Sequence, residues 1–341
     1  MMILGIETSC DETAVAVLEG TGDPSPSAIK LRSNIIASQI ALHRQFGGVV
    51  PEVASRCHVE TIIPVMDEAL SEAGVSLSDI TVVAATHGPG LVGAVLVGLS
   101  AAKALALAQD IPFVGVNHIE AHMYANFIEH PDLAPPFVCL VVSGGHSDLV
   151  YLKDYGDYEV MGRTRDDAAG EAFDKVARTL GLSYPGGPAI DLAAREGDSQ
   201  AVRFPRAFLE EGSYDFSFSG LKTAVVNYVA NARRKEREVF VPDIAASFQE
   251  AVVDVLVTKT LRAACEIGVN TVALAGGVAA NSRLRQELSR RAIEKGMDVR
   301  YPSPILCTDN AAMVACVGYF RLVSGELSSL DLPAVPNLHL E

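Results

Sequence analysis

Short apolar runs alternate with polar turns and amphipathic stretches along most of the chain. The apolar run at 2–6 leads into the polar turn at 8–13, and residues 14–18 are apolar again. Two apolar runs that flank a short polar loop predict a β-hairpin. The same arrangement recurs across 137–152, where the polar turn is Ser143-Gly-Gly-His-Ser-Asp148. We therefore expect one hairpin early in each half of the chain.

A second pair of similar segments follows these hairpins. The apolar run at 80–85 leads into the turn at 86–90, and the run at 271–275 leads into the turn at 276–281. A helix-like stretch follows each turn, so both segments predict a strand, a glycine-rich turn and a helix. The preserved order of these elements predicts an internal duplication with a period of about half the chain.

Helical periodicity is clearest in the second half. Pro242 and Asp243 precede an i,i+4 row of mostly apolar residues, which predicts a long helix capped by Asp243. The row consists of Ile244, Phe248, Val252, Leu256 and Thr260. A further helix is expected over 311–324. Residues 162–222 are less regular and rich in turn residues, which predicts an insertion that forms a lid or a wall of a site.

The length of 341 residues suits about two domains of roughly 150 residues each. We expect a first lobe over 1–136, onto which a C-terminal helix at 311–341 packs back. The second lobe is expected over 137–310. Because no flexible linker separates the lobes, the cleft between them is the expected site.

Charge and cysteine usage restrict the class of protein. The 27 Lys and Arg against 42 Asp and Glu give a net charge of −15, so a global basic surface for nucleic acid is absent. The densest basic run is 231–237, and a second one comprises Arg283, Arg285, Arg290 and Arg291. Such residues are either solvated helix faces or local phosphate contacts. Six cysteines without a CxxC pair predict reduced thiols in a cytosolic protein.

Two segments bear on targeting and on membrane association. The first 13 residues hold a short apolar run and then acids, which is unlike a signal peptide. The stretch 90–108 is the most membrane-like, but it contains Gly93, Gly98, Ser100 and Lys103. A buried helix of an α/β layer is therefore expected there, in a cytoplasmic protein that does not span a membrane.

Three glycine- or hydroxyl-rich turns have the composition of anion-binding loops. Successive backbone N–H groups of Ser143-Gly-Gly-His146 can point at one anion, and the turn at 8–13 offers hydroxyls in the matching place of the first lobe. Gly276-Gly277 precedes a helix, whose N-terminus favours a ligand's negative charge. Together the three turns predict a nucleotide held between two lobes. Neither a P-loop nor a Rossmann fingerprint is present.

The segment His118-Ile-Glu-Ala-His122 is a candidate metal-binding motif. Residues at i and i+4 share a helix face, so both imidazoles can reach one ion. Asp309, in Cys307-Thr-Asp-Asn310, is the candidate third ligand. Two histidines and one carboxylate leave open coordination positions, which favours Fe(II) or Zn over a closed structural site. The alternative is a pair of ordinary core or surface histidines.

A metalloprotease requires a different spacing. In HExxH enzymes the residue directly after the first histidine is the general base. That position is Ile119 here, and Glu120 lies roughly 200° around the helix from His118.

Six other acids are candidates to contact a nucleotide or to act as bases; the alternative is that they are helix caps or turn residues. They are Asp11, Glu12, Asp166, Asp167, Asp174 and Asp191.

Ten motifs are spread across nearly the whole chain. They are GIETSCDET at 5–13, GGVVPEVASR at 47–56, HGPGLVGAVLVG at 87–98, HIEAH at 118–122, LVVSGGH at 140–146, GEAFDK at 170–175, YPGGP at 184–188, FSFSGLKT at 216–223, AGGVAAN at 275–281 and CTDNAAM at 307–313. Together these motifs resemble the universal family of tRNA threonylcarbamoyladenosine synthesis transferases, in its bacterial form. Members of this family were once described as O-sialoglycoprotein endopeptidases.

The resemblance implies an α/β, two-lobed actin-like ATPase fold with internally duplicated lobes, as in sugar kinases, heat-shock chaperones and actin. It implies that His118, His122 and Asp309 bind one metal ion per chain, usually Fe(II). Asp11 and Glu12 match the first phosphate loop and are the candidate catalytic residues. The positions that match the substrate site are Val141, Val142, Ser143, Gly144, Gly145, Asp174, Gly187, Asp191 and Asn281.

The reaction that the resemblance implies is an acyl transfer. Threonylcarbamoyl-adenylate is the donor, the exocyclic amine of adenosine 37 in tRNAs that read codons beginning with A is the acceptor, and AMP leaves. The family's partners are tRNA, a paralogous actin-like subunit and a small P-loop ATPase. The alternatives are a kinase or chaperone-type ATPase of the same fold, a metalloprotease, or a scaffolding subunit.

Overall fold

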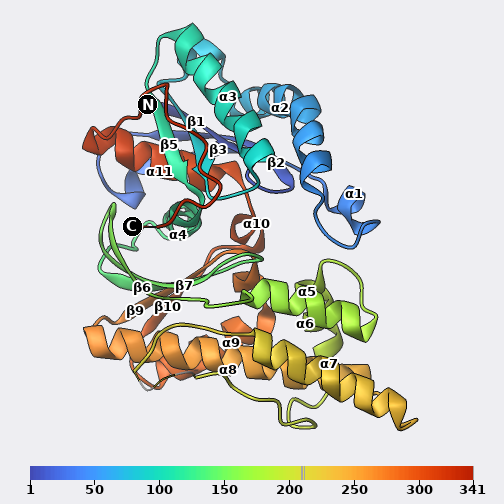
Figure 1. Cartoon of the computed structure of the whole chain (residues 1–341). Coiled ribbons are helices and arrows are strands. Elements are labelled where there is room, and N and C mark those ends of the chain that lie inside the picture. The colour runs from blue at the N-terminus through green and yellow to red at the C-terminus, as the bar shows by residue number, and fades with distance from the viewer. Residues whose placement is uncertain (209, 211, 341) are drawn as a thin grey trace. The chain divides into compact units, whose positions relative to one another are not determined.

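The computed structural model describes residues 1–208, 210 and 212–340 (Figure 1). The chain divides into two compact units. The first unit comprises Met1–Ala134 and Pro302–Glu341, and the second comprises Pro135–Tyr301. Each unit contains one mixed five-stranded sheet with helices packed on it, so the chain is an α/β protein.

The first sheet has the strand order β3-β2-β1-β4-β5. β1 pairs antiparallel with β2, and β2 pairs antiparallel with β3, whereas β1–β4 and β4–β5 are parallel. The strands are β1 (Met2–Glu7), β2 (Glu12–Gly20), β3 (Ile29–Ser38), β4 (Val82–Gly88) and β5 (Phe113–Asn117). The predicted first hairpin is therefore confirmed as β1–β2.

Alternation along β1 distributes its side chains between two helix layers. Leu4 and Ile6 belong to one core cluster with residues of α2 (Pro51–Ala73) and α3 (Val92–Gln109). Gly5 lies against the backbone of α11 (Ala311–Ser324), where a Cβ would stand 2.3 Å from the carbonyl oxygen of Ala311. Helix α11 therefore packs on the face of the sheet opposite α2 and α3. It also contacts α4 (His118–Glu129).

The second sheet repeats the topology of the first. Its order is β8-β7-β6-β9-β10, which is the first order with five added to each strand number. The strands are β6 (Phe137–Val142), β7 (Ser147–Asp154), β8 (Asp157–Arg163), β9 (Thr271–Ala275) and β10 (Asp298–Arg300). β6 pairs antiparallel with β7 and parallel with β9. The predicted second hairpin and the predicted duplication are confirmed.

Five longer helices surround this sheet. They are α5 (Ala169–Leu180), α6 (Gly186–Ala194), α7 (Ser219–Arg234), α8 (Val241–Ile267) and α9 (Ser282–Ile293). Short helical segments complete the chain, namely α1 (Ile40–Arg44), α10 (Pro304–Cys307), η1 (Pro26–Ala28), η2 (Leu77–Asp79) and η3 (Gly277–Ala280).

Two local expectations need correction. The i,i+4 row of α8 is buried as predicted, but the helix is capped at Phe240 and not at Asp243. Asp243 lies in the first turn, where its carboxylate accepts a hydrogen bond from the backbone of Asp198. The expected irregular insertion at 162–222 contains two regular helices, α5 and α6, because their apolar faces pack on each other and on α8.

Helix α3 has the length and composition of a membrane span. Among the residues that the structure describes it is the one helix that satisfies both conditions, and 33% of its apolar window is buried. Length and composition do not separate a membrane span from a helix that packs on a sheet, and α3 contacts β4 and α2.

Candidate functional site

Helix α4 places two imidazoles on one face. Asn117 caps the helix by accepting hydrogen bonds from the backbone of Ile119 and Glu120, so the helix begins at His118. His118 and His122 are one turn apart, and their ring centroids are separated by 4.6 Å. His122 is fully buried, and His118 keeps a small exposed fraction.

The carboxylate of Asp309 lies against both rings. Its Oδ1 atom is 3.5 Å from Nε2 of His118 and 3.2 Å from Nε2 of His122. Asn310, the N-cap of α11, holds the turn that carries Asp309 by donating to the carbonyl oxygens of Thr308 and Leu306. The three candidate ligand atoms all lie within 4.8 Å of one another. The structure therefore brings together the three residues that the sequence analysis selected.

Glu7 is a residue of this cluster that the sequence analysis missed. It ends β1 with no exposed surface, and its Oε2 atom lies 2.9 Å from Nδ1 of His118. The same oxygen accepts a hydrogen bond from the hydroxyl of Thr86, and Oε1 accepts one from the backbone of Ser9. A carboxylate on Nδ1 fixes the tautomer that leaves Nε2 free, as behind many metal-ligating histidines. The available signal was a glutamate at the end of an otherwise apolar strand.

The protonation equilibria of these groups are strongly coupled to burial and to one another. Burial alone lowers the pKa of His118, but the facing carboxylates of Asp309 and Glu7 outweigh it and hold that pKa well above the ordinary value. Burial lowers the pKa of His122. Burial opposes the ionisation of Asp309, yet both histidines hold its pKa below the usual range. The cluster thus combines an anionic carboxylate with an imidazole that burial keeps neutral.

The residues present fit a divalent metal ion. Within the described part of the chain, neither ring nitrogen of the buried His122 makes a hydrogen bond, although its Nε2 atom lies 3.2 Å from Oδ1 of Asp309. A buried imidazole that makes no hydrogen bond costs stability, and coordination of one nitrogen would remove that cost. Two imidazoles and one carboxylate form a donor set typical of Fe(II) and catalytic Zn²⁺ sites.

Asp11 and Glu12 lie beside this cluster, Asp11 in the turn after β1 and Glu12 at the start of β2. Burial, together with the charges of Asp309 and Asp11, raises the pKa of Glu12 to about 9. Its Oε1 atom accepts a hydrogen bond from the hydroxyl of Ser38. The acids at positions 7, 11, 12 and 309 therefore crowd one region, and a cation there would reduce their mutual repulsion.

Glu120, the acid next to the position where a metalloprotease would need its general base, is engaged elsewhere. It is buried and forms an ion pair of 2.6 Å with Arg321 of α11. That pair connects α4 to α11 and turns the carboxylate away from the two histidines. The structure therefore agrees with the expectation that Glu120 lies off the histidine face.

In the second unit the turn at 143–146 offers backbone groups. Its two glycines, Gly144 and Gly145, are exposed, and a Cβ on either would meet no atom within 4 Å. Neither glycine has a left-handed φ. Their value is therefore open space beside the backbone N–H groups and not unusual torsion angles. Val141 and Val142 are fully buried, so only their backbone can contact a ligand.

The turn after β9 adjoins this loop because β9 pairs with β6. Gly276 has φ +85°, and a Cβ there would lie 2.4 Å from the carbonyl oxygen of Val142. Only glycine is accommodated at this close approach. From the other side, the backbone N–H of Gly170 in α5 donates to the carbonyl oxygen of Ser143.

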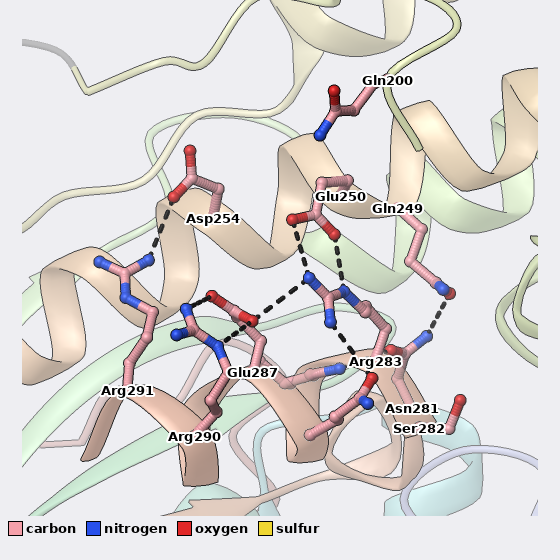
Figure 2. Close-up of polar contacts among 12 residues, drawn as sticks. Gln200, Gln249, Glu250, Asp254, Asn281, Ser282, Arg283, Glu287, Arg290 and Arg291 are labelled. Atoms are coloured by element: carbon pink, nitrogen blue, oxygen red, sulfur yellow. Dashed lines mark hydrogen bonds and ion pairs between the residues drawn. The ribbon is translucent and has the colours of Figure 1, made fainter. Parts of the chain in front are cut away.

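Asn281 caps α9 and is part of a polar network (Figure 2). Its Nδ2 donates to Oε1 of Gln249 at 2.7 Å, and its Oδ1 accepts from the backbone of Leu284. The adjacent Ser282 donates to Oδ1 of Asp191 on α6. The structure therefore brings Asp191 close to the turn that holds Asn281.

The remaining two expected substrate residues lie where α5 approaches the start of α6. Asp174 accepts a hydrogen bond of 2.6 Å from the backbone of Gly186, so its carboxylate orients the first turn of α6. A Cβ on the next residue, Gly187, would face open space. Asp174 and Gly187 are therefore neighbours in the second unit.

Comparison with solved structures identifies the fold class as that of the actin-like ATPases. The chain is similar to component A of (R)-2-hydroxyglutaryl-CoA dehydratase from Acidaminococcus fermentans, with 14% identity, a TM-score of 0.54, and coverage of 95% of this chain and 99% of that one. It is also similar to full-length HypF in its phosphate- and nucleotide-bound form, with 16% identity and a TM-score of 0.61 over 94% of this chain. The chain spans about half of that HypF, namely 46%. These likenesses show the actin-like ATPase fold.

Sequence comparison specifies the family within that class. The family model for tRNA N6-adenosine threonylcarbamoyltransferase matches residues 30–316. Relatives with that name are 56% identical in Clostridioides difficile (100% of this chain, 98% of the relative), 57% in Clostridium botulinum (99% and 97%) and 56% in Caldicellulosiruptor saccharolyticus (100% and 98%). The chain belongs to the tRNA N6-adenosine threonylcarbamoyltransferase family.

Proposed function

We propose that this chain transfers the threonylcarbamoyl group from threonylcarbamoyl-adenylate to the exocyclic amine of adenosine 37 in tRNAs that read codons beginning with A, with release of AMP. Full-length identity of 56% to relatives named for this transfer supports the proposal. The single structural observation that carries it is the convergence of His118, His122 and Asp309 in a chain that also presents an exposed glycine turn at 143–146.

The proposed reaction requires the enzyme to orient its two substrates more than to activate the donor. The donor is a mixed anhydride, which is already activated towards an amine, so catalysis depends on positioning and on stabilising the charge that develops. The N–H groups of Gly144 and Gly145 bind the adenylate phosphate, and Asn281 orients the nucleotide-linked part of the donor. Asp11 or Glu12 accepts the amine proton.

His118, His122 and Asp309 hold one divalent ion, for which Fe(II) is the first choice and Zn²⁺ the second. Such an ion supplies Lewis-acid polarisation of a phosphate or carbamoyl oxygen. The chain's own contribution is to fix the donor set, because Glu7 orients His118 and Asn310 orients the turn of Asp309.

The proposed partners are tRNA, a paralogous actin-like subunit and a small P-loop ATPase, in the cytoplasm. An exposed apolar surface on α2 and α3 supports a protein partner. Val59 and Ile63 of α2, with Val92 and Leu96 of α3, expose large apolar side chains on two helices that contact each other. Ile63→Glu is expected to abolish co-purification with the paralogous subunit, whereas Ile293→Glu, at an exposed position of the second unit, is expected to preserve it.

Mass analysis of nucleosides tests the proposed reaction. Unmodified tRNA is incubated with the chain, its partner subunits and threonylcarbamoyl-adenylate, then digested. Threonylcarbamoyladenosine is expected only when all components are present. Transfer of a phosphoryl group to a small molecule without tRNA, and no modified nucleoside, would instead favour a kinase of the same fold.

A further inference from the structure

The two basic runs of the sequence differ in how the structure uses them. In the run at 283–291, Arg283 forms a two-pronged ion pair with Glu250, Arg290 pairs with Glu287, and Arg291 pairs with Asp254 (Figure 2). These charges are neutralised by acids of the same unit. They are held in place by the fold and are not available as a free positive surface.

The run at the end of α7 has no such neutralisation. Arg234, Lys235 and Arg237 are exposed, and within residues 1–208, 210 and 212–340 their side chains have no hydrogen-bond or ion-pair partner. Arg233 donates only to a backbone carbonyl, that of Thr179. Residues 233–238 contain four cations and two acids, so the segment carries a local charge of +2 in a chain whose net charge is −15.

Stabilisation of the helix end accounts for part of this composition. Cations in the last turn interact favourably with the helix dipole, and Arg233 and Arg234 occupy that turn. Arg237 lies beyond the helix, however, and the turn continues to Phe240, whose side chain is 55% exposed. Neighbouring free cations and an exposed aromatic ring are the combination that binds the phosphates and unstacked bases of RNA.

The position of α7 within the second unit also suits an RNA ligand. The backbone N–H groups of Phe218 and Ser219, at the start of α7, donate to Asp166, and the segment that follows Asp166 leads into α5. Gly170 of α5 bonds to Ser143 of the glycine loop. The 16 residues of α7 therefore extend from beside that loop over about 24 Å to Arg234. Figure 1 shows α7 at the edge of the unit, on the side of α5 and α6.

We propose that the α7–α8 turn, residues 233–240, is a contact surface for the tRNA substrate, with Arg234, Lys235 and Arg237 on backbone phosphates and Phe240 against an unpaired base or ribose. This assignment rests on the proposed function. An acidic protein repels a polyanion at long range, so a local cluster of unneutralised cations is required to hold it. If the target adenosine of the tRNA reaches the glycine loop, the backbone phosphates several nucleotides further along the RNA would lie at the end of α7.

Binding of an unmodified tRNA transcript to the assembled enzyme, with its partner subunits, tests this surface across a range of salt concentrations. In the triple variant Arg234→Gln/Lys235→Gln/Arg237→Gln we expect affinity at least about 10-fold lower. The slope of log K against log salt should fall by about 0.7–0.9 for each phosphate that is no longer neutralised. The KM for threonylcarbamoyl-adenylate and kcat at saturating tRNA should be unchanged. Phe240→Ala should lower affinity by about 10-fold with the salt slope unchanged.

The matched control neutralises three exposed cations elsewhere, Lys30→Gln/Arg203→Gln/Lys295→Gln, and changes net charge by the same amount. An equal loss of affinity in both triple variants, or an unchanged salt slope in the α7–α8 variant, would overturn the proposal. If the triple variant melts early, Arg237→Gln, beyond the helix, carries the test with an expected slope change of about 0.7–0.9. Because wild-type enzyme is measured in parallel, absence of tRNA modification there would count against the proposed reaction and not against this surface.

Discussion

The first unit builds its candidate site from side chains, whereas the second unit builds its own from backbone. In the first unit, His118, His122 and Asp309 are positioned by hydrogen bonds of Glu7 and Asn310, and their ligand atoms converge. In the second, Gly144 and Gly145 contribute open space beside the backbone, and Gly276 permits a close approach to the backbone of Val142. The two sheets share one topology, but the histidines follow β5, whereas the glycine turns follow β6 and β9, the counterparts of β1 and β4. One duplicated fold can thus carry a candidate metal-binding cluster in one half and a candidate anion-binding loop in the other.

Removing a candidate metal ligand should have the largest effect on this contrast. His122→Ala is expected to abolish stoichiometric metal binding, measured by elemental analysis. Substitution of a residue that hydrogen-bonds to a metal ligand typically costs about 10–100-fold in activity. The rate of threonylcarbamoyl transfer to tRNA should fall by more than this in His122→Ala. His130→Ala, just past the end of the same helix, is the control. Full metal content in His122→Ala would remove the cluster from the account.

Glu7→Gln should have the next largest effect. Loss of the carboxylate behind His118 is expected to weaken metal affinity by about 10–100-fold, because the imidazole loses its fixed orientation. Competition with a chromophoric chelator, using Zn²⁺ or Co²⁺, measures this without an activity assay. Glu19→Gln, in the neighbouring strand, should leave affinity unchanged. Equal affinities for Glu7→Gln and wild type would show that Glu7 has no part in metal binding.

Substitutions of the adjacent glycines Gly276 and Gly277 test the backbone site of the second unit. Gly276→Ala is expected to lower the free energy of unfolding by at least about 1–3 kcal/mol, since φ is +85° and the new Cβ would meet the backbone of Val142. Gly277→Ala, which faces open space, should change it by less than about 0.5 kcal/mol. Urea unfolding distinguishes them, and similar losses for both would contradict the assigned close approach.

The smallest expected effect concerns the orientation of Asn281. Gln249→Leu removes the acceptor of the Asn281 amide, which should cost about 1 kcal/mol of stability. The KM for threonylcarbamoyl-adenylate should rise by less than about 10-fold, because the Asn281 side chain still caps α9 through Leu284. Gln200→Leu on the exposed surface is the control. An unchanged KM in Gln249→Leu would separate this amide interaction from donor binding.

The sequence was most informative where spacing alone determines geometry. An i,i+4 pair of histidines on α4 must share a face, and the repeated order of hairpin and glycine turn required two equivalent sheets. The placement of Asp309 required the fold, because it lies far along the chain from His122 and no local pattern joins them. That such a cluster binds iron stays a prediction.

The errors and omissions concern tertiary contacts. Asp243 has the composition of a cap, but α8 begins at Val241 because Pro242 suits its first turn. Glu7 was missed because its partners, Thr86 and His118, come from distant elements. The turn at 143–146 was selected by its composition, and only the folded structure shows that open space, and not a left-handed φ, is what Gly144 and Gly145 provide.

Reconstitution of metal-free enzyme tests the central claim most directly. The chain is stripped with a chelator, assembled with its partners, and supplied with tRNA and threonylcarbamoyl-adenylate, with and without one equivalent of Fe(II) under anaerobic conditions. We expect threonylcarbamoyladenosine, detected by mass spectrometry, only in the sample with metal, and in neither sample for His122→Ala. Equal yields of the modified nucleoside with and without metal would contradict the account.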